Sequence, residues 1–281
     1  MKLFRNLKTI ARQPGLVPAY LQWCAWRSVD HVPRPKFRSQ PNQRSEASIG
    51  EWFTFSEYWT YRELIPRSEE RLLLHALSRP DSLPGFALDV GSNLGIFACR
   101  IASLGHQVHA FEPMPDTYER LVKNIESNGL GDFARANLLG IGDAEGFAEF
   151  ERPVNSPGQS RISTSGGPDV TRVPLTTLDQ YVERASIPYV DFLKIDVEGM
   201  ETRVIRGGRK AFEAKRIGTV LIEISPWNLN HAGTSPLELF EEIDSVGYGA
   251  WRLQDNGSPG EPWQSIDLEQ IISENFVLLP K

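Results

Sequence analysis

The stretch Phe86-Ala87-Leu88-Asp89-Val90-Gly91-Ser92-Asn93-Leu94-Gly95 decides the fold of this 281-residue chain. Its first half is an apolar run that predicts a buried strand, and apolar residues recur at helical spacing after Gly95. Gly91 permits a sharp turn with a positive φ, and Gly95 permits a close approach of backbone or ligand. A strand, a glycine loop and a helix in this order predict a nucleotide-type cofactor site, because the free N–H groups of the new helix face the ligand.

A second predicted strand, 108–111, ends in Glu112. A carboxylate at this place in the fold accepts hydrogen bonds from ribose hydroxyls. The nicotinamide fingerprint needs a glycine two positions after Gly91, where this chain has Asn93, so a dinucleotide fits poorly. A nicotinamide-dependent oxidoreductase is therefore an alternative rather than the main interpretation, and a catalytically silent binding module that kept the fold is another.

The rest of the chain alternates predicted strands and helices. Beyond the first two strands, strands are predicted at 136–141, 190–195, 219–224, 250–253 and 276–279, with a β-rich excursion at 147–175. Helices are predicted near 69–77, 115–127, 200–214 and 236–246. This alternation predicts an α/β fold with a mainly parallel, doubly wound sheet covered by helices on both faces.

Acidic residues follow several of these strands. Asp89, Glu112, Asp143, Asp196 and Glu223 all come at or just after a strand end, where ligands bind in such sheets. Each could instead cap the next helix or pair with a lysine. Their joint placement favours a cofactor and acceptor cleft, and an acidic cleft also suits a cationic ligand.

Six ordered segments, spanning roughly residues 86–225, resemble the FkbM family of S-adenosylmethionine-dependent methyltransferases. They are 89–95, 111–113, 137–143, 173–179, 194–199 and 221–223. The resemblance is sharpest at Lys194-Ile195-Asp196-Val197-Glu198-Gly199. It implies a class I methyltransferase fold, which is Rossmann-like with a seven-stranded sheet, and S-adenosylmethionine as the cofactor.

The resemblance also implies roles for individual residues. Asp89 would orient the loop and the amino-acid end of the cofactor, Glu112 would hold the ribose, and Asp143 would reach the adenine amine. The loop and the strand end supply the other expected cofactor-binding residues: Gly91, Ser92, Asn93, Gly95 and Pro113.

FkbM-type enzymes generally methylate hydroxyls of glycans or secondary metabolites. A hydroxyl holds its proton tightly, so it needs a general base or a divalent metal ion that lowers its pKa. Asp196 and Glu198 are the first candidates for the base, followed by Lys194, Glu223 and His231. Alternatively, Lys194 and Glu198 form an ion pair that only locks the turn, and His231 is a solvated loop residue.

Charge divides the chain into two parts. Residues 1–44 carry nine basic residues and one acidic residue, which gives this segment a net charge of +8, whereas the whole chain has a net charge of −6. Leu3, Phe4, Leu7 and Ile10 share one face of a possible helix. Residues 1–48 are therefore predicted to form a basic amphipathic extension and linker, followed by a catalytic domain at 49–281. Residues 1–28 would either contact an anionic membrane surface or dock on the domain or a second subunit.

Other partners and compartments are constrained by what the sequence lacks. Cys24 and Cys99 have neither metal-ligand nor disulfide spacing. A span of about 20 apolar residues and the apolar core of a secretion signal are missing, which predicts a cytoplasmic enzyme, with the basic segment offering peripheral contact at the inner membrane face. Asp196-Val197-Glu198 stands where nucleic-acid amino-methylating enzymes carry Asn/Asp-Pro-Pro-aromatic, and the acidic domain would repel a polyanion. A specific nucleic-acid partner is not expected.

Overall fold

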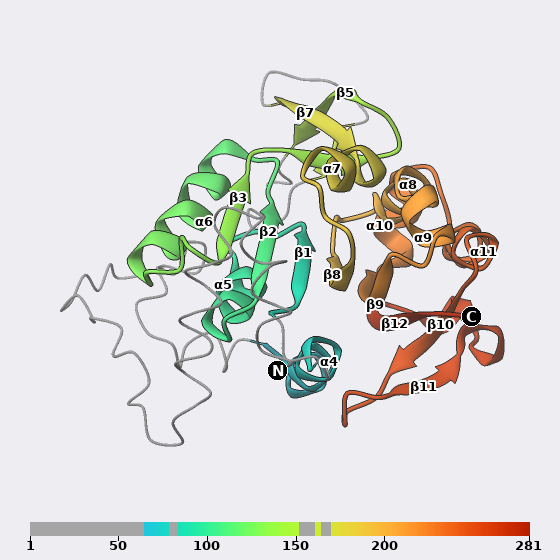
Figure 1. The fold of residues 1–281 in the computed structure, drawn as a ribbon. Coiled ribbons are helices and arrows are strands. Elements are labelled where there is room, and N and C mark those ends of the chain that lie inside the picture. Colours follow the sequence, from blue (N-terminus) through green and yellow to red (C-terminus); the bar gives the residue numbers. More distant parts are fainter. Residues whose placement is uncertain (1–64, 79–83, 152–160, 164–169) are drawn as a thin grey trace, which may run out of the picture.

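The computed structural model describes residues 65–78, 84–151, 161–163 and 170–281 (Figure 1). The predicted extension, the boundary at residue 48 and the basic segment 1–28 lie outside these ranges. Within them, every helix is too short or too polar to cross a bilayer.

An eight-stranded sheet forms the centre of the molecule, in the order β11-β10-β12-β9-β8-β1-β2-β3. The parallel strands are β1 (Phe86–Val90), β2 (Gln107–Phe111), β3 (Ala134–Asn137), β8 (Val190–Ile195) and β9 (Ile217–Ile224). The antiparallel strands are β10 (Tyr248–Leu253), β11 (Pro259–Pro262) and β12 (Glu274–Pro280). The predicted fold class is confirmed, with β11 added as an eighth strand at the edge.

Helices cover both faces of this sheet (Figure 1). One apolar cluster joins the sheet to α4 (Arg67–Leu77), α5 (Ile96–Ser103) and α6 (Pro115–Ser127). The other joins it to α7 (Leu178–Arg184), α8 (Glu201–Gly207), α9 (Arg209–Glu213), α10 (Pro226–His231) and α11 (Pro236–Ser245). Two short 3-10 helices, η1 (Trp263–Ser265) and η2 (Leu268–Gln270), precede β12.

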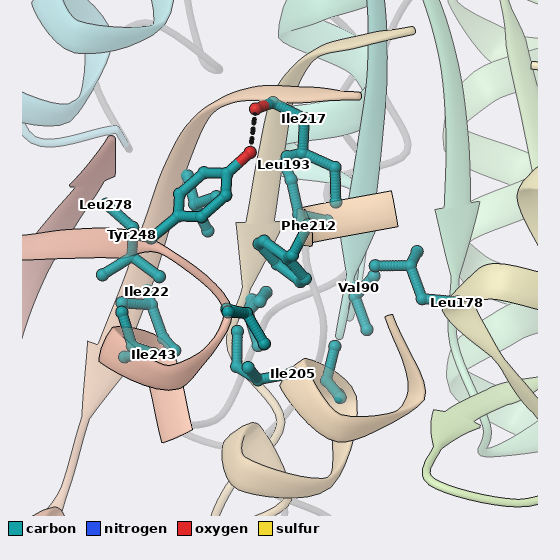
Figure 2. Packing of buried hydrophobic residues seen from close by; sticks show 14 of the residues in the cluster. Val90, Leu178, Leu193, Ile205, Phe212, Ile217, Ile222, Ile243, Tyr248 and Leu278 are labelled. Carbon is teal, nitrogen blue, oxygen red and sulfur yellow. Dashed lines mark hydrogen bonds between the residues drawn. The ribbon is translucent and has the colours of Figure 1, made fainter. Parts of the chain in front are cut away.

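The second of these clusters is the larger one. Figure 2 shows Val90 and Leu193 of the sheet packed with Phe212 of α9, and Tyr248 donating a hydrogen bond to the carbonyl oxygen of Ile217. Because the phenol oxygen has a partner, this aromatic ring is buried without leaving a polar group unsatisfied. The core thus fixes the strands whose ends carry the acidic residues.

A second, four-stranded sheet follows β3, in the order β4-β7-β5-β6. Its strands are β4 (Gly140–Gly142), β5 (Gly146–Glu151), β6 (Arg161–Ile162) and β7 (Thr171–Thr177), which confirms the predicted β-rich excursion. The prediction of one strand over 136–141 is wrong. The chain leaves the main sheet after Asn137, and β4 pairs with β7 in the second sheet, with Gly140 opposite Leu175.

The connections change direction at β1. From β1 the chain runs outward through β2 and β3, and it then returns to place β8 and β9 on the opposite side of β1. The carboxyl ends of β1 and β8 therefore flank a crevice at this switch point, where open α/β sheets bind their ligands.

Candidate active site

A cavity opens at the switch point between β1 and β8. It comprises about 700 Å³ of empty space, including space open to solvent. Its wall is formed by Val90, Gly91, Asn93, Phe111, Glu112, Pro113, Thr117, Leu139, Gly140, Ile141, Phe150, Asp196, Val197, Glu198 and Met200. The segments that follow β1, β2, β3 and β8 therefore meet here.

The loop after β1 is held in a conformation that needs its glycines. Gly91 has a φ of +81°, and a Cβ at this position would overlap the carbonyl oxygen of Asp196. Ser92 Oγ donates to the carbonyl of Asp89 at 2.6 Å and accepts from the N–H of Phe111 at 2.9 Å, which ties the loop to β2. Gly95 begins α5 with a φ of +83°. Ser92 and Gly95 shape the loop but are not among the lining residues.

Glu112 connects this loop to the end of β2. Its side chain is only 4% exposed and accepts hydrogen bonds from the backbone N–H groups of Asn93 and Met114, both at 3.0 Å. A carboxylate oxygen has two lone pairs, so each can accept a further hydrogen bond. Glu112 is therefore fixed in the wall of the cavity with acceptor capacity for a ligand hydroxyl.

Two predicted cofactor residues lie elsewhere. Asp89 is 1% exposed and accepts a hydrogen bond from the N–H of Ala98 at 3.1 Å, so it caps α5 in the way that the alternative interpretation allowed. Burial raises the pKa of Asp89. Asp143 follows β4, is exposed, and is not among the lining residues.

Asp196 follows β8, lies in the cavity wall and forms an ion pair with Lys194. Its side chain is 32% exposed, and Lys194 Nζ lies 2.8 Å from its Oδ2 and 4.0 Å from Oδ1 of Asp89. Burial alone would raise the pKa of Asp196, but the Lys194 ammonium lowers it below its usual value. The two acids raise the pKa of Lys194 against the effect of burial. Asp196 is thus held ionised and Lys194 protonated.

Glu223, on β9, forms a carboxyl pair with Asp196. The two side chains are within hydrogen-bond reach, and Ser273 Oγ donates to Glu223. Burial, and after it the charge of Asp196, raises the pKa of Glu223. The two carboxyl groups thus form an unequal pair, in which Glu223 holds a proton more readily than Asp196 does.

The turn after Asp196 is held by Glu198 and by two residues that were not predicted site residues, Asn228 and Glu201. Glu198 has a φ of +52° and accepts a hydrogen bond from Asn228 of α10. The buried Glu201 accepts from the N–H groups of Val197 at 3.3 Å and Gly199 at 3.1 Å. The ion pair considered between Lys194 and Glu198 is not what holds this turn. An acid in the first turn of α8 was the signal that could have identified Glu201.

His231 lies in α10, where a loop was predicted. Pro226 starts this helix and Ser225 caps it, a combination that favours a helix start. His231 is exposed and stacks on Trp227 with ring centroids 5.5 Å apart and ring planes 4° apart. It is not among the lining residues of the cavity.

The predicted site residues therefore fall into two sets. The cavity wall contains Gly91, Asn93, Glu112, Pro113, Asp196 and Glu198. The other predicted residues are not among the lining residues: Asp89, Ser92, Gly95, Lys194, Glu223, Asp143 and His231. The sequence did not indicate the apolar wall residues Leu139 and Phe150, because they come from the excursion into the second sheet. Across the described ranges, no three His, Cys, Asp or Glu side chains are grouped to hold a metal ion.

Comparison with known proteins gives a consistent result. The sequence model of the protein family described as the methyltransferase FkbM domain matches residues 89–249 of this chain. The chain is 34% identical over 191 residues to the hexuronic acid methyltransferase AglP of Haloferax volcanii, over 65% of this chain and 70% of that protein. It is 28% identical over 192 residues to the 2-O-methyltransferase NoeI of Sinorhizobium fredii, over 62% of this chain and 75% of that protein.

Among solved structures, a TehB-like S-adenosylmethionine-dependent methyltransferase from Corynebacterium glutamicum superposes with a TM-score of 0.43 at 14% identity, over 79% of this chain and 95% of that one. The fold and the site define a Rossmann-like enzyme with a nucleoside-type cofactor. The family match and the relatives assign the chain to the FkbM family. It is an S-adenosylmethionine-dependent methyltransferase, and the predicted family is confirmed.

Proposed function

We propose that this enzyme methylates a hydroxyl group of a glycan or a small metabolite, with Asp196 as the general base. The observation that carries the proposal is an ionised carboxylate, held by Lys194 at 2.8 Å, in the wall of a cavity that the glycine loop also lines. The names of the relatives, a hexuronic acid methyltransferase and a 2-O-methyltransferase, support a sugar hydroxyl as the acceptor.

The residues present fit S-adenosylmethionine. The absence of a Cβ at Gly91 lets the glycine loop lie against the backbone of Asp196 in the cavity wall, and Glu112 offers a fixed carboxylate for ribose hydroxyls. Leu139 and Ile141 supply an apolar wall suited to an adenine ring. When bound, S-adenosylmethionine supplies a methyl group activated by its sulfonium and leaves as neutral S-adenosylhomocysteine.

The remaining task of the protein is to hold the acceptor and remove its proton. An acceptor hydroxyl that loses its proton as the O–C bond forms needs a base within hydrogen-bond reach. Asp196 meets this need because Lys194 keeps it ionised. The proton moves from the acceptor oxygen to a carboxylate oxygen of Asp196, beside which Lys194 stays protonated.

The other candidates for the base are weaker. Lys194 is protonated and cannot accept a proton, and Glu223 is not among the residues that line the cavity. Glu198 is engaged by Asn228 and is better suited to orient the acceptor. His231 lies outside the cavity wall.

We propose a base that works without a metal ion, since the Lys194 ammonium already supplies the positive charge beside Asp196. Treatment with a chelator is therefore expected to leave methyl transfer unchanged. The assay is transfer of tritium from methyl-labelled S-adenosylmethionine to an extract of cells that lack the protein. Loss of transfer, restored by adding back a divalent metal ion, would show instead that a metal lowers the pKa of the acceptor.

The experiment that tests the proposed function is mass spectrometry of glycans and metabolites from the native organism with and without the protein. We expect one or more compounds to lose a single methyl group when the protein is absent. Unchanged spectra would favour the catalytically silent binding module.

For residues 1–28 we propose contact with anionic lipid, supported by the +8 balance over residues 1–44. The full-length protein is expected to sediment with vesicles that contain phosphatidylserine, less so as salt is raised, because surface charges are screened over about 8–10 Å near physiological ionic strength. A protein lacking residues 1–28 should stay in the supernatant. Equal sedimentation of the two proteins would favour docking of this segment on the domain.

A further inference from the structure

The face of the sheet that α4 and α5 cover carries both apolar and polar side chains. Ala87, Phe192, Leu221 and Val277 of this face belong to the apolar cluster that includes the helices. Four polar residues of the same face lie toward the edge where the cavity opens and are here called the polar layer: Asp89, Lys194, Glu223 and Asn275. Asp89 stands opposite Lys194, which itself stands opposite Leu221, and Glu223 stands opposite Asn275 two residues further along β9. The polar layer therefore leads to the carboxyl end of β8, where Asp196 follows.

Helix α4 adds one more carboxylate to this layer. Glu69 is 8% exposed and accepts a hydrogen bond from Asn275 Nδ2 at 2.8 Å, across 206 positions of sequence. Helix α4 packs against β8 and β9, the strands that carry Lys194 and Glu223. Glu69 interacts electrostatically with Lys194, Asp196 and Glu223.

The cluster has more acids than it can ionise together. Within the part of the chain that the structure describes, Glu69, Asp89, Asp196 and Glu223 face one cation, Lys194. Asp89 Oδ1 is buried without a hydrogen-bond donor, and its nearest cation is Lys194 at 4.0 Å. Because an uncompensated buried charge is costly, protons remain on part of the cluster. Burial raises the pKa of Glu69 to about 7.

We infer that Glu69 is a positioning residue of the acceptor site, whose charge controls how strongly Asp196 takes up the acceptor proton. This inference rests on the proposed function. When Glu69 ionises, a further negative charge beside Asp196 favours the protonated form of Asp196 and so favours proton removal from the acceptor. The proton balance is simple, because Glu69 releases its own proton to solvent and Asp196 receives the one from the acceptor.

Other charged groups approach the cluster and have to be separated from Glu69. Glu201 of α8 faces Asp196, and burial raises its pKa to about 7 as well. Glu70, next to Glu69 on α4, is turned to Arg100 of α5 at 2.6 Å in a buried ion pair. Glu70 and Glu69 thus form a matched pair of neighbouring buried acids, of which only Glu69 faces the cluster.

The experiment compares Glu69→Gln, Glu201→Gln and Glu70→Gln in the full-length protein. Methyl transfer is measured from tritiated S-adenosylmethionine to the extract of cells that lack the protein, between about pH 6 and pH 8. Transfer by the unchanged protein is expected to rise by up to about tenfold over this range, as a group with a pKa near 7 ionises. Glu69→Gln should remove most of that rise, whereas Glu70→Gln should keep it.

Thermal unfolding provides a readout that needs no acceptor. The pKa of Glu69 is higher in the folded protein than in the unfolded chain, so the protonated carboxyl contributes stability that is fully present below the pKa of the unfolded chain. This contribution to the free energy of unfolding is lost as pH rises through about 7. Glu69→Gln should therefore match the unchanged protein near pH 4.5 and exceed it in melting temperature near pH 8. Glu70→Gln should melt roughly 5–15 °C lower, because a neutral amide replaces the carboxylate that pairs with the buried Arg100.

Two results would overturn the inference. One is a Glu69→Gln protein that keeps the full rise in transfer while Glu201→Gln loses it, which would assign the control to Glu201. The other is a melting temperature for Glu69→Gln that is lower at every pH, which would make Glu69 a structural residue. If the proposed function itself were wrong, the result would differ from both of these. Neither the unchanged protein nor any variant would then transfer methyl groups to the extract.

Discussion

Asp196→Asn is expected to lower methyl transfer by roughly 10²- to 10⁴-fold, the usual contribution of a general base. The amide keeps the size of the side chain and an oxygen that accepts from Lys194, so the fold and the affinity for S-adenosylmethionine should stay close to those of the unchanged protein. Transfer to the extract of cells lacking the protein, calorimetric titration and thermal unfolding measure the three quantities separately.

The control for this change is Asp132→Asn, which alters an exposed acid away from the cavity wall and should leave all three quantities unchanged. If Asp196→Asn lowered the melting temperature but retained normal transfer per folded molecule, Asp196 would only stabilise the turn after β8.

The second large effect is expected for Glu112→Ala, in binding rather than in turnover. Loss of a charge-assisted hydrogen bond costs about 1.5–3 kcal/mol, which is a weakening of S-adenosylmethionine binding by roughly 10- to 150-fold. The change also frees the N–H groups of Asn93 and Met114, so part of the loss would come from a looser glycine loop. Isothermal titration with S-adenosylhomocysteine measures the effect without turnover.

Glu119→Ala, on the exposed side of α6, is the matched control and should bind normally. Unchanged affinity in Glu112→Ala would mean that the ribose is held elsewhere. NAD is expected not to bind either protein, since Asn93 takes the place of the glycine that a pyrophosphate needs.

The parts of the fold that the sequence predicted well have strong local patterns. The helix Pro115–Ser127 and the strand Val190–Ile195 are confirmed to the residue, because one has proline at its start and a clear apolar face and the other is buried on both sides. The strand Pro259–Pro262 has no such pattern. It consists of proline, glycine and glutamate, and only its pairing with β10 makes it a strand.

The site divides in the same way. The glycine loop, Glu112 and Asp196 lie within a few residues of a strand end, so short motifs identify them. The roles of Glu223, Asn228 and Glu69 depend on contacts between elements far apart in the chain, such as the bond from Asn275 to Glu69. Glu69 shares a helix face with Leu72 and Leu73, which predicts burial, but no local pattern indicates what it would face.

The central claim is that the enzyme transfers a methyl group to a hydroxyl oxygen. The most direct test incubates the protein with S-adenosylmethionine carrying ¹³C in its methyl group and an extract of cells that lack the protein, and reads the product by NMR. A new signal of an O-methyl ether, absent with Asp196→Asn, is the expected result. A signal of an N-methyl or C-methyl group, or an ether signal that Asp196→Asn leaves at full strength, would contradict the account.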